Sequence, residues 1–195
     1  MRGGRRTDGR GAGDVWKGLA AGLVGGLVAS WTMNRFQDVW SKLSESDGQS
    51  AGTQVSQAGE GQASGQAEQQ AQAGSEEQTD ATVKAAAAVS EGIFDHKLTK
   101  SEKKIAGPAV HYAFGTLVGG LFGACAELAP EVTAGAGVPF GAAFWLVADE
   151  AAVPLLGLSK GPTEYPLSVH AYALASHFVY GLTAELVRRS LRAAM

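Results

Sequence analysis

The feature that most limits how this chain can fold is the apolar stretch from Val138 to Leu158, which carries two adjacent acids, Asp149 and Glu150. A helix of about 20 apolar residues spans the ~30 Å hydrocarbon core of a bilayer. Two acids near the centre of such a helix cost roughly 5 to 7 kcal/mol on the insertion scale, which leaves the stretch only marginally able to insert alone. We therefore expect it to enter a membrane beside other helices that shelter or neutralise the acids.

Three further segments are apolar and Gly-rich, and the sequence as a whole predicts an all-α, four-helix transmembrane bundle. Transmembrane helices are expected over residues 15–35, 106–129, 134–158 and 166–188. The third is expected to be kinked at Pro154. Pro108 is expected as the first residue of the second helix, where a missing N–H costs no helical hydrogen bond. The first segment could instead be the h-region of a signal peptide, although it lacks a good cleavage site.

The remaining segments are polar. Residues 44–79 are rich in Gln, Gly, Ser and Glu and contain no Lys or Arg, which predicts a disordered loop between the first and second spans. Residues 1–14 and 189–195 are expected to be a disordered basic N-terminus and a basic C-terminus. Short surface helices are expected over 80–105, with a capping box at Thr99 and Glu102. Four lysines there either contact lipid headgroups or form a solvated face: Lys97, Lys100, Lys103 and Lys104.

Small residues recur every four positions along the predicted spans. This spacing drifts slowly around a helix of about 3.6 residues per turn, so each set lines one face and lets a neighbouring backbone approach closely. The residues expected to pack helices together are Gly18, Gly22, Gly26, Gly115, Gly119, Gly123, Gly141 and Gly181. The same ridges are compatible with a homo-oligomer.

Ionisable side chains lie within the last three predicted spans. Such groups are costly in hydrocarbon and mark ion pathways or polar pairs by default. We expect an intramembrane polar cluster of His111, Asp149, Glu150, His170 and His177, and a secondary polar pair of Glu127 and Glu185 toward the other side. Because imidazole titrates near neutral pH, the cluster can hold or relay protons. Imidazole and carboxylate groups also ligate divalent metals, but no zinc-site spacing is present and we predict no metal or cofactor.

Charge and motifs argue against several classes of function. The net charge is −3, so we expect no nucleic-acid partner. The sequence has no nucleophile elbow, no P-loop and no H-E-x-x-H motif, and we expect no enzymatic activity. A membrane hydrolase, or haem held by two histidines, stays open as an alternative.

The two ends of the chain carry a further signal. It comprises Pro154-Leu155-Leu156-Gly157-Leu158, a short Pro-containing loop, His177, and a basic end from Glu185 to Arg192. Together with the basic N-terminus that leads into Gly18-Leu19-Ala20-Ala21, these residues resemble the YagU family of bacterial inner-membrane proteins. The resemblance leaves out the Gln/Gly-rich middle. It implies a multispan inner-membrane protein without an established biochemical activity, and it supplies no catalytic residues.

An even number of spans places both termini on the same side of the membrane. Arg-rich sequence at both ends indicates that this side is the cytoplasm. The contrary signal is the lysine group before Pro108 together with Arg35 and Lys42, but these lie in a loop longer than about 60 residues, where that rule weakens. The expected partner is the lipid bilayer. One functional hypothesis is envelope homeostasis or proton and ion handling through the buried cluster. The other is a structural or assembly role without transport, in which the polar loop recruits an unknown protein.

Overall fold

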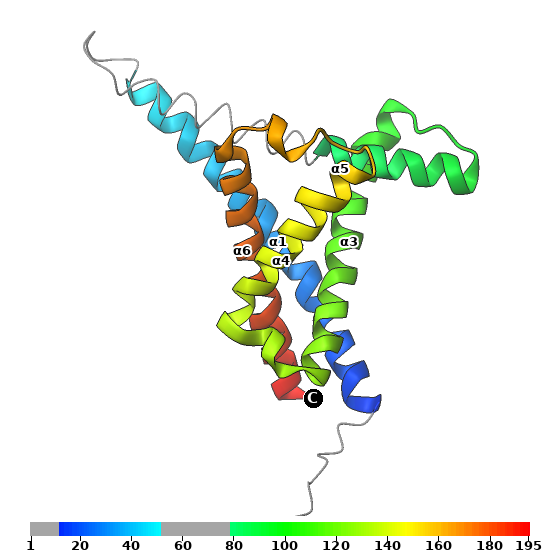
Figure 1. Cartoon of the computed structure of the whole chain (residues 1–195), viewed down its shortest axis with the longest axis vertical. Coiled ribbons are helices and arrows are strands. Elements are labelled where there is room, and N and C mark those ends of the chain that lie inside the picture. Colours follow the sequence, from blue (N-terminus) through cyan, green and yellow to red (C-terminus); the bar gives the residue numbers. More distant parts are fainter. Residues whose placement is uncertain (1–11, 52–78) are drawn as a thin grey trace, which may run out of the picture.

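Figure 1 shows the computed structural model of the chain, which describes residues 12–51 and 79–195. The helices in this part are α1 (Ala12–Ala51), a helical segment over residues 79–94, α3 (Lys100–Leu128), α4 (Val138–Val147), α5 (Val153–Leu155) and α6 (Leu167–Ala194). No strand occurs among the described residues. The predicted all-α class is therefore confirmed.

Three helices have bounds that differ from the predicted ones. α6 continues to Ala194, past the predicted end at 188 and into the predicted basic C-terminus. α1 continues to Ala51, past the predicted end of the first span and into the segment predicted to be a linker. The rest of that linker, and most of the predicted N-terminal tail over 1–14, lies outside the described residues. α3 begins at Lys100, so Pro108 lies inside a helix instead of starting one. Proline at this position frees the carbonyl of Lys104, an exposed residue whose backbone water can satisfy.

The third predicted span consists of several short helices. The 3₁₀-helix η1 (Pro130–Gly137) precedes α4, and the π-helix η2 (Ala148–Ala152) separates α4 from α5. Pro154 has no N–H, so the carbonyl of Glu150 loses its usual helical partner. The neighbouring N–H of Val153 bonds the carbonyl of Ala148, five residues back. The irregularity expected at Pro154 is thus a π turn that lies just before it and contains both acids.

Glycines form the closest helix contacts. On the antiparallel pair α1 and α3, Gly18, Gly22 and Gly26 face Gly123, Gly119 and Gly115. On the antiparallel pair α4 and α6, Gly141 faces Gly181 and the carbonyl of His177. A Cβ at any of these positions would meet backbone or buried side-chain atoms of the facing helix. Because the ridges are occupied inside the chain, they do not by themselves argue for a homo-oligomer.

A small core lies between α1, α4 and α6. Ala29, Met33, Tyr180 and Ala184 are almost fully buried there, and Phe140 and Phe144 pack against them. Tyr180 also donates a hydrogen bond from its hydroxyl to the carbonyl of Gly115 on α3. One tyrosine of α6 therefore links the glycine-packed pair α1–α3 to the rest of the bundle.

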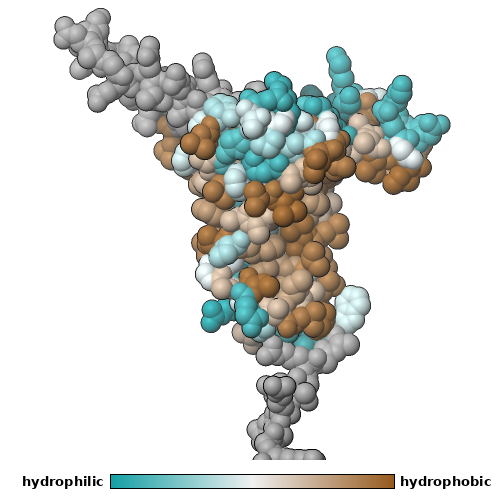
Figure 2. Space-filling view, in the orientation of Figure 1, coloured by the Kyte–Doolittle hydropathy of each residue, from teal (hydrophilic) through white to brown (hydrophobic). Residues whose placement is uncertain are grey.

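Most other large apolar side chains face outward. Trp31, Leu117, Leu121, Leu146 and Leu186, from α1, α3, α4 and α6, are each more than half exposed. Figure 2 shows that hydrophobic residues cover the middle of the visible face and that hydrophilic residues gather toward its two ends. Two helical stretches of the described chain are long and apolar enough to cross a membrane, Lys100–Leu128 and Pro130–Leu155. The predicted spans in α1 and α6 are less apolar.

The start of α3 contains the predicted capping box. Thr99 Oγ1 accepts a hydrogen bond from the N–H of Glu102, and the Glu102 carboxylate accepts one from the N–H of Thr99 at 2.7 Å. His96 Nε2 lies 3.2 Å from the same carboxylate. The backbone N–H of Thr99, then its hydroxyl and the His96 ring, lower the pKa of Glu102 from 4.5 to about 2.

We expect Thr99→Ala to raise the pKa of Glu102 partway toward 4.5, since the hydroxyl is lost and the backbone donor stays. A lowered pKa means that this carboxylate supports the helix start fully above pH 4.5, and that the support is lost as the pH falls through about 2. Carboxyl NMR titration in detergent micelles measures the shift. Ser190→Ala, which removes an exposed hydroxyl of α6, is the control, and an unmoved midpoint in Thr99→Ala would contradict the assignment.

Candidate functional site

The five residues of the predicted polar cluster line one cavity. Its volume is about 370 Å³, and its lining comes from α1, residues 79–94, α3, the α4–α5 stretch and α6. Most of the lining is apolar or aromatic, including Phe114, Phe144, Tyr172 and Tyr180. His111 enters from α3, Asp149 and Glu150 from η2, and His170 and His177 from α6. The structure therefore gathers all the predicted ionisable groups of the cluster around a single space.

The π turn aims both acids at α6. From regular helical spacing, Glu150 is expected about 100° around the helix from Asp149. In the structure, Glu150 Oε1 lies 2.6 Å from His170 Nδ1, and Asp149 Oδ2 lies 3.7 Å from His177 Nδ1. The two histidines are seven residues apart and share a face of α6. Two His–carboxylate pairs therefore follow each other along the contact between η2 and α6.

The Glu150–His170 pair is completed by a backbone carbonyl. His170 Nε2 lies 2.9 Å from the carbonyl oxygen of Pro162, and its Nδ1 contacts the Glu150 carboxyl group. A carbonyl oxygen can only accept a hydrogen bond, so the proton of that contact is on His170 Nε2. The contact between His170 Nδ1 and Glu150 Oε1 is attractive only if a second proton lies between these two atoms. Both side chains are less than one-fifth exposed. The pair thus shares one proton in a largely buried position.

Three polar groups of the cavity keep unused hydrogen-bonding capacity. Within the described part of the chain, the buried Nε2 of His111 and the buried hydroxyl of Tyr172 have no hydrogen-bond partner. Asp149 makes only the 3.7 Å contact, because His177 Nδ1 donates to the carbonyl of Ala173 at 2.9 Å. Unsatisfied buried groups point to a water molecule, an ion or a ligand. In 12–51 and 79–195 no group of three or more His, Cys, Asp or Glu side chains is arranged to hold a metal ion.

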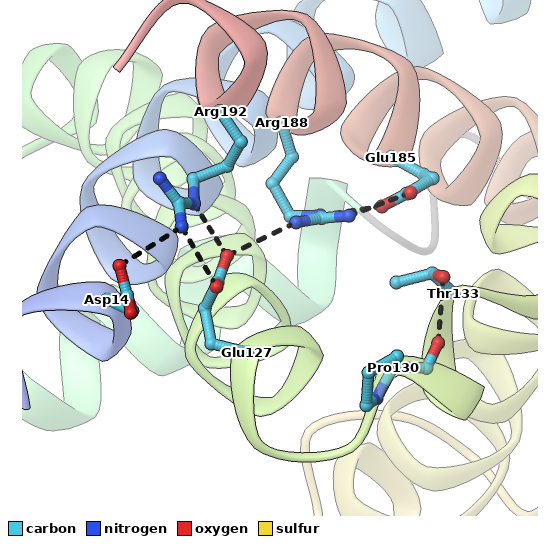
Figure 3. Close-up of polar contacts among 7 residues, drawn as sticks. All are labelled: Asp14, Glu127, Pro130, Thr133, Glu185, Arg188 and Arg192. Atoms are coloured by element: carbon cyan, nitrogen blue, oxygen red, sulfur yellow. Dashed lines mark hydrogen bonds and ion pairs between the residues drawn. The ribbon is translucent and has the colours of Figure 1, made fainter. Parts of the chain in front are cut away.

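The second predicted pair, Glu127 and Glu185, lies at the opposite end of the bundle and is joined by arginines (Figure 3). Arg192 donates to both oxygens of Glu127 at 2.6 and 3.0 Å. Arg188 donates to both oxygens of Glu185 at 2.7 and 2.8 Å and lies 3.7 Å from Glu127. Asp14 lies 3.6 Å from Arg192. This network ties the start of α1, the end of α3 and the end of α6 together.

Sequence reasoning missed several members of both sites. It assigned the arginines of α6 to membrane orientation, although their positions three and seven residues after Glu185 place them on one face of the helix. It did not include Tyr172 or Lys160, which also line the cavity. Tyrosine is common near membrane interfaces, and a lysine in a polar loop carries no periodic signal. Only the arginines could have been found from local spacing.

A profile of a family described as protein of unknown function (DUF1440) matches residues 83–186, just over half of the chain. The chain belongs to the DUF1440 family. The DUF1440 match begins within the helical segment 79–94 and contains every ionisable residue predicted for the cavity, as well as Glu127 and Glu185. It leaves out α1 and the two arginines of the charge network. No curated protein and no solved structure matches the chain.

Proposed function

We propose that this DUF1440 protein crosses the membrane as a bundle of four helices. The apolar windows of Lys100–Leu128 and Pro130–Leu155 are only 33% and 11% buried, whereas the core helix of a soluble protein is mostly buried. Outward leucines and tryptophans on the neighbouring helices support the same conclusion. The start of α1 and the end of α6 meet at one end, where Lys17 Nζ donates to the carbonyl of Met195 at 3.4 Å. Together with the Arg-rich termini and the YagU resemblance, this favours an inner-membrane location with both termini in the cytoplasm.

We further propose that the cavity handles protons or small cations. The observation that carries this proposal is the convergence of three histidines and two acids on one cavity. Ionisable groups within membrane helices are costly and mark ion and proton pathways. π turns also recur at functional sites, and here one presents both acids. We propose that a proton released by the Glu150–His170 pair passes to Asp149, the neighbouring acid of the π turn, whose carboxylate lies 3.7 Å from His177 Nδ1.

We expect Asp149→Asn to abolish a pH-dependent flux across proteoliposome membranes, measured with an enclosed pH-sensitive dye. An amide side chain does not take up a proton near neutral pH. The variant therefore loses the group that we propose accepts the proton from the Glu150–His170 pair. Glu131→Gln, which removes an exposed acid in η1, is the matched control and should leave the flux unchanged. A wild-type protein without flux would rule out ion handling.

A structural or assembly role is the second candidate, and the charge network favours it. Glu185 and Arg188 are paired with each other and need no ligand, and the Glu150–His170 contact also fixes η2 against α6. In this case the wild type carries no flux, and Asp149→Asn changes only the melting temperature in detergent. The same two measurements therefore separate the two functions.

A further inference from the structure

Residues 79–106 form an arm that projects sideways from the bundle, at the end away from the C-terminus (Figure 1). The arm consists of the helical segment 79–94, the connection 95–99 and the first turns of α3. Its connection is closed by Ser90, whose hydroxyl donates to the carbonyl of His96 at 2.8 Å. At its base, a Cβ on Gly107 would lie 2.8 Å from Val83 Cγ2, so the segment packs directly on α3. Lys84 Nζ donates to the carbonyl of Leu158 at 3.2 Å. The arm is thus a folded hairpin fixed to the bundle.

The arm exposes large apolar side chains. Ile93, Phe94 and Ile105 are between 71% and 74% exposed, and Val89 is 51% exposed. Figure 2 shows hydrophobic residues on the side of the arm that faces the apolar middle of the bundle, and hydrophilic residues on the opposite side. A soluble surface seldom leaves such a patch uncovered. An amphipathic helix at a membrane interface buries its apolar face at the acyl-chain boundary.

Four lysines of the arm have no ion-pair partner in the described part of the chain: Lys97, Lys100, Lys103 and Lys104. Two acids of the arm are already used, since Asp80 pairs with Lys84 at 2.7 Å and Glu102 contacts His96 at 3.2 Å. Only Glu91 and Asp95 remain to offset the lysines. Clusters of this kind beside a membrane helix attract anionic headgroups.

We infer that the arm lies in the membrane interface and binds anionic phospholipid headgroups. Its isoleucines and Phe94 enter the acyl-chain boundary, and its lysines contact phosphate groups. The apolar face and the basic cluster belong to one rigid hairpin at the level where the apolar surface of the bundle ends, so one orientation satisfies both. This inference rests on the proposed transmembrane bundle. It concerns a surface that the cavity does not need for its chemistry.

Spin-label accessibility in liposomes tests the inference on the full chain. Cys125, the single cysteine, is replaced by Ser, and one new cysteine is introduced for labelling. The variants are Phe94→Cys on the apolar side of the arm, Lys103→Cys in the basic cluster, and Leu121→Cys on the outward face of α3. We expect oxygen to reach the labels at 94 and 121 more readily than a water-soluble nickel chelate, and the reverse order at 103.

The possible results distinguish the interfacial position of the arm from the transmembrane position of the bundle. If the label at 121 is lipid-exposed but the label at 94 is reached by the chelate, the interfacial position of the arm is wrong and the transmembrane proposal stands. If both labels are reached by the chelate, the transmembrane proposal fails and the inference fails with it.

The headgroup part has its own test. Removing phosphatidylglycerol from phosphatidylcholine liposomes should make the label at 94 more accessible to the chelate. Changing the four lysines to Gln should have the same effect in liposomes that contain phosphatidylglycerol. Lys42→Gln, an exposed lysine of α1 outside both the arm and the cavity, is the matched control and should not change the accessibility. If the label depth does not depend on either change, recognition of anionic headgroups is wrong.

Discussion

Gly119→Leu is expected to prevent α1 and α3 from packing, so that the protein elutes from a size-exclusion column in detergent as aggregate. A Cβ at Gly119 would lie 2.5 Å from the Cα of Gly26 and 2.7 Å from the carbonyl oxygen of Gly22. Both are backbone atoms, which cannot turn aside as a side chain can. Even modest overpacking costs about 1–3 kcal/mol, and leucine adds a whole side chain where no space exists.

The matched control is Gly92→Leu in the arm, where an added Cβ would meet nothing within 4 Å. This variant should elute and melt as the wild type does. Gly119→Ala should fall between the two, with a melting temperature below that of the wild type. If Gly119→Leu has the same melting temperature as Gly92→Leu, the close approach of α1 and α3 is not part of the folded protein.

Arg188→Met is expected to lower the free energy of unfolding by about 3–5 kcal/mol, because it leaves a buried carboxylate without its partner. Glu185 is 5% exposed, and both of its hydrogen bonds come from Arg188. Unfolding by denaturant in detergent, followed by circular dichroism, measures the change. Arg189→Met is the control, since Arg189 is exposed and one position away.

A double variant tests whether the loss comes from the unpaired charge. Arg188→Met with Glu185→Met removes both charges, and buried ion pairs can often be replaced by apolar residues with little loss. We therefore expect the double variant to regain most of the stability lost by Arg188→Met. A double variant less stable than Arg188→Met would show that the arginine acts through other contacts.

Features set by local spacing could be predicted from the sequence. The glycines of α1 and α3 recur every four residues, and this is enough to place them on one face and to expect close helix contact. Thr99 and Glu102 identify the start of a helix for the same reason, since the capping box is a local pattern. The five ionisable residues of the cavity could be predicted because hydrocarbon leaves such side chains few alternatives to one another.

Features that depend on a choice between local rules, or on distant partners, could not be predicted. Pro108 favours a helix start, but the helix begins at the Thr99 cap nine residues earlier, because the freed carbonyl of Lys104 faces solvent. The π turn at Asp149 and Glu150 lies just before Pro154, and its two acids contact histidines of α6 that local spacing does not identify as partners. Arg192 pairs with Glu127 on another helix, 65 positions away in the sequence. No pattern within α6 indicates that partner.

The way the helices are joined has a consequence for access to the cavity. α3 and α4 contact each other through two pairs of aromatic rings: Phe122 and Phe140 are stacked with centroids 4.1 Å apart, and Phe114 and Phe144 are tilted with centroids 5.7 Å apart. These are contacts between side chains, whereas α1 and α3 meet backbone to backbone at their glycines. Phe114 and Phe144 also line the cavity. The cavity is therefore bounded on the side between α3 and α4 by this pair of rings and not by a glycine contact.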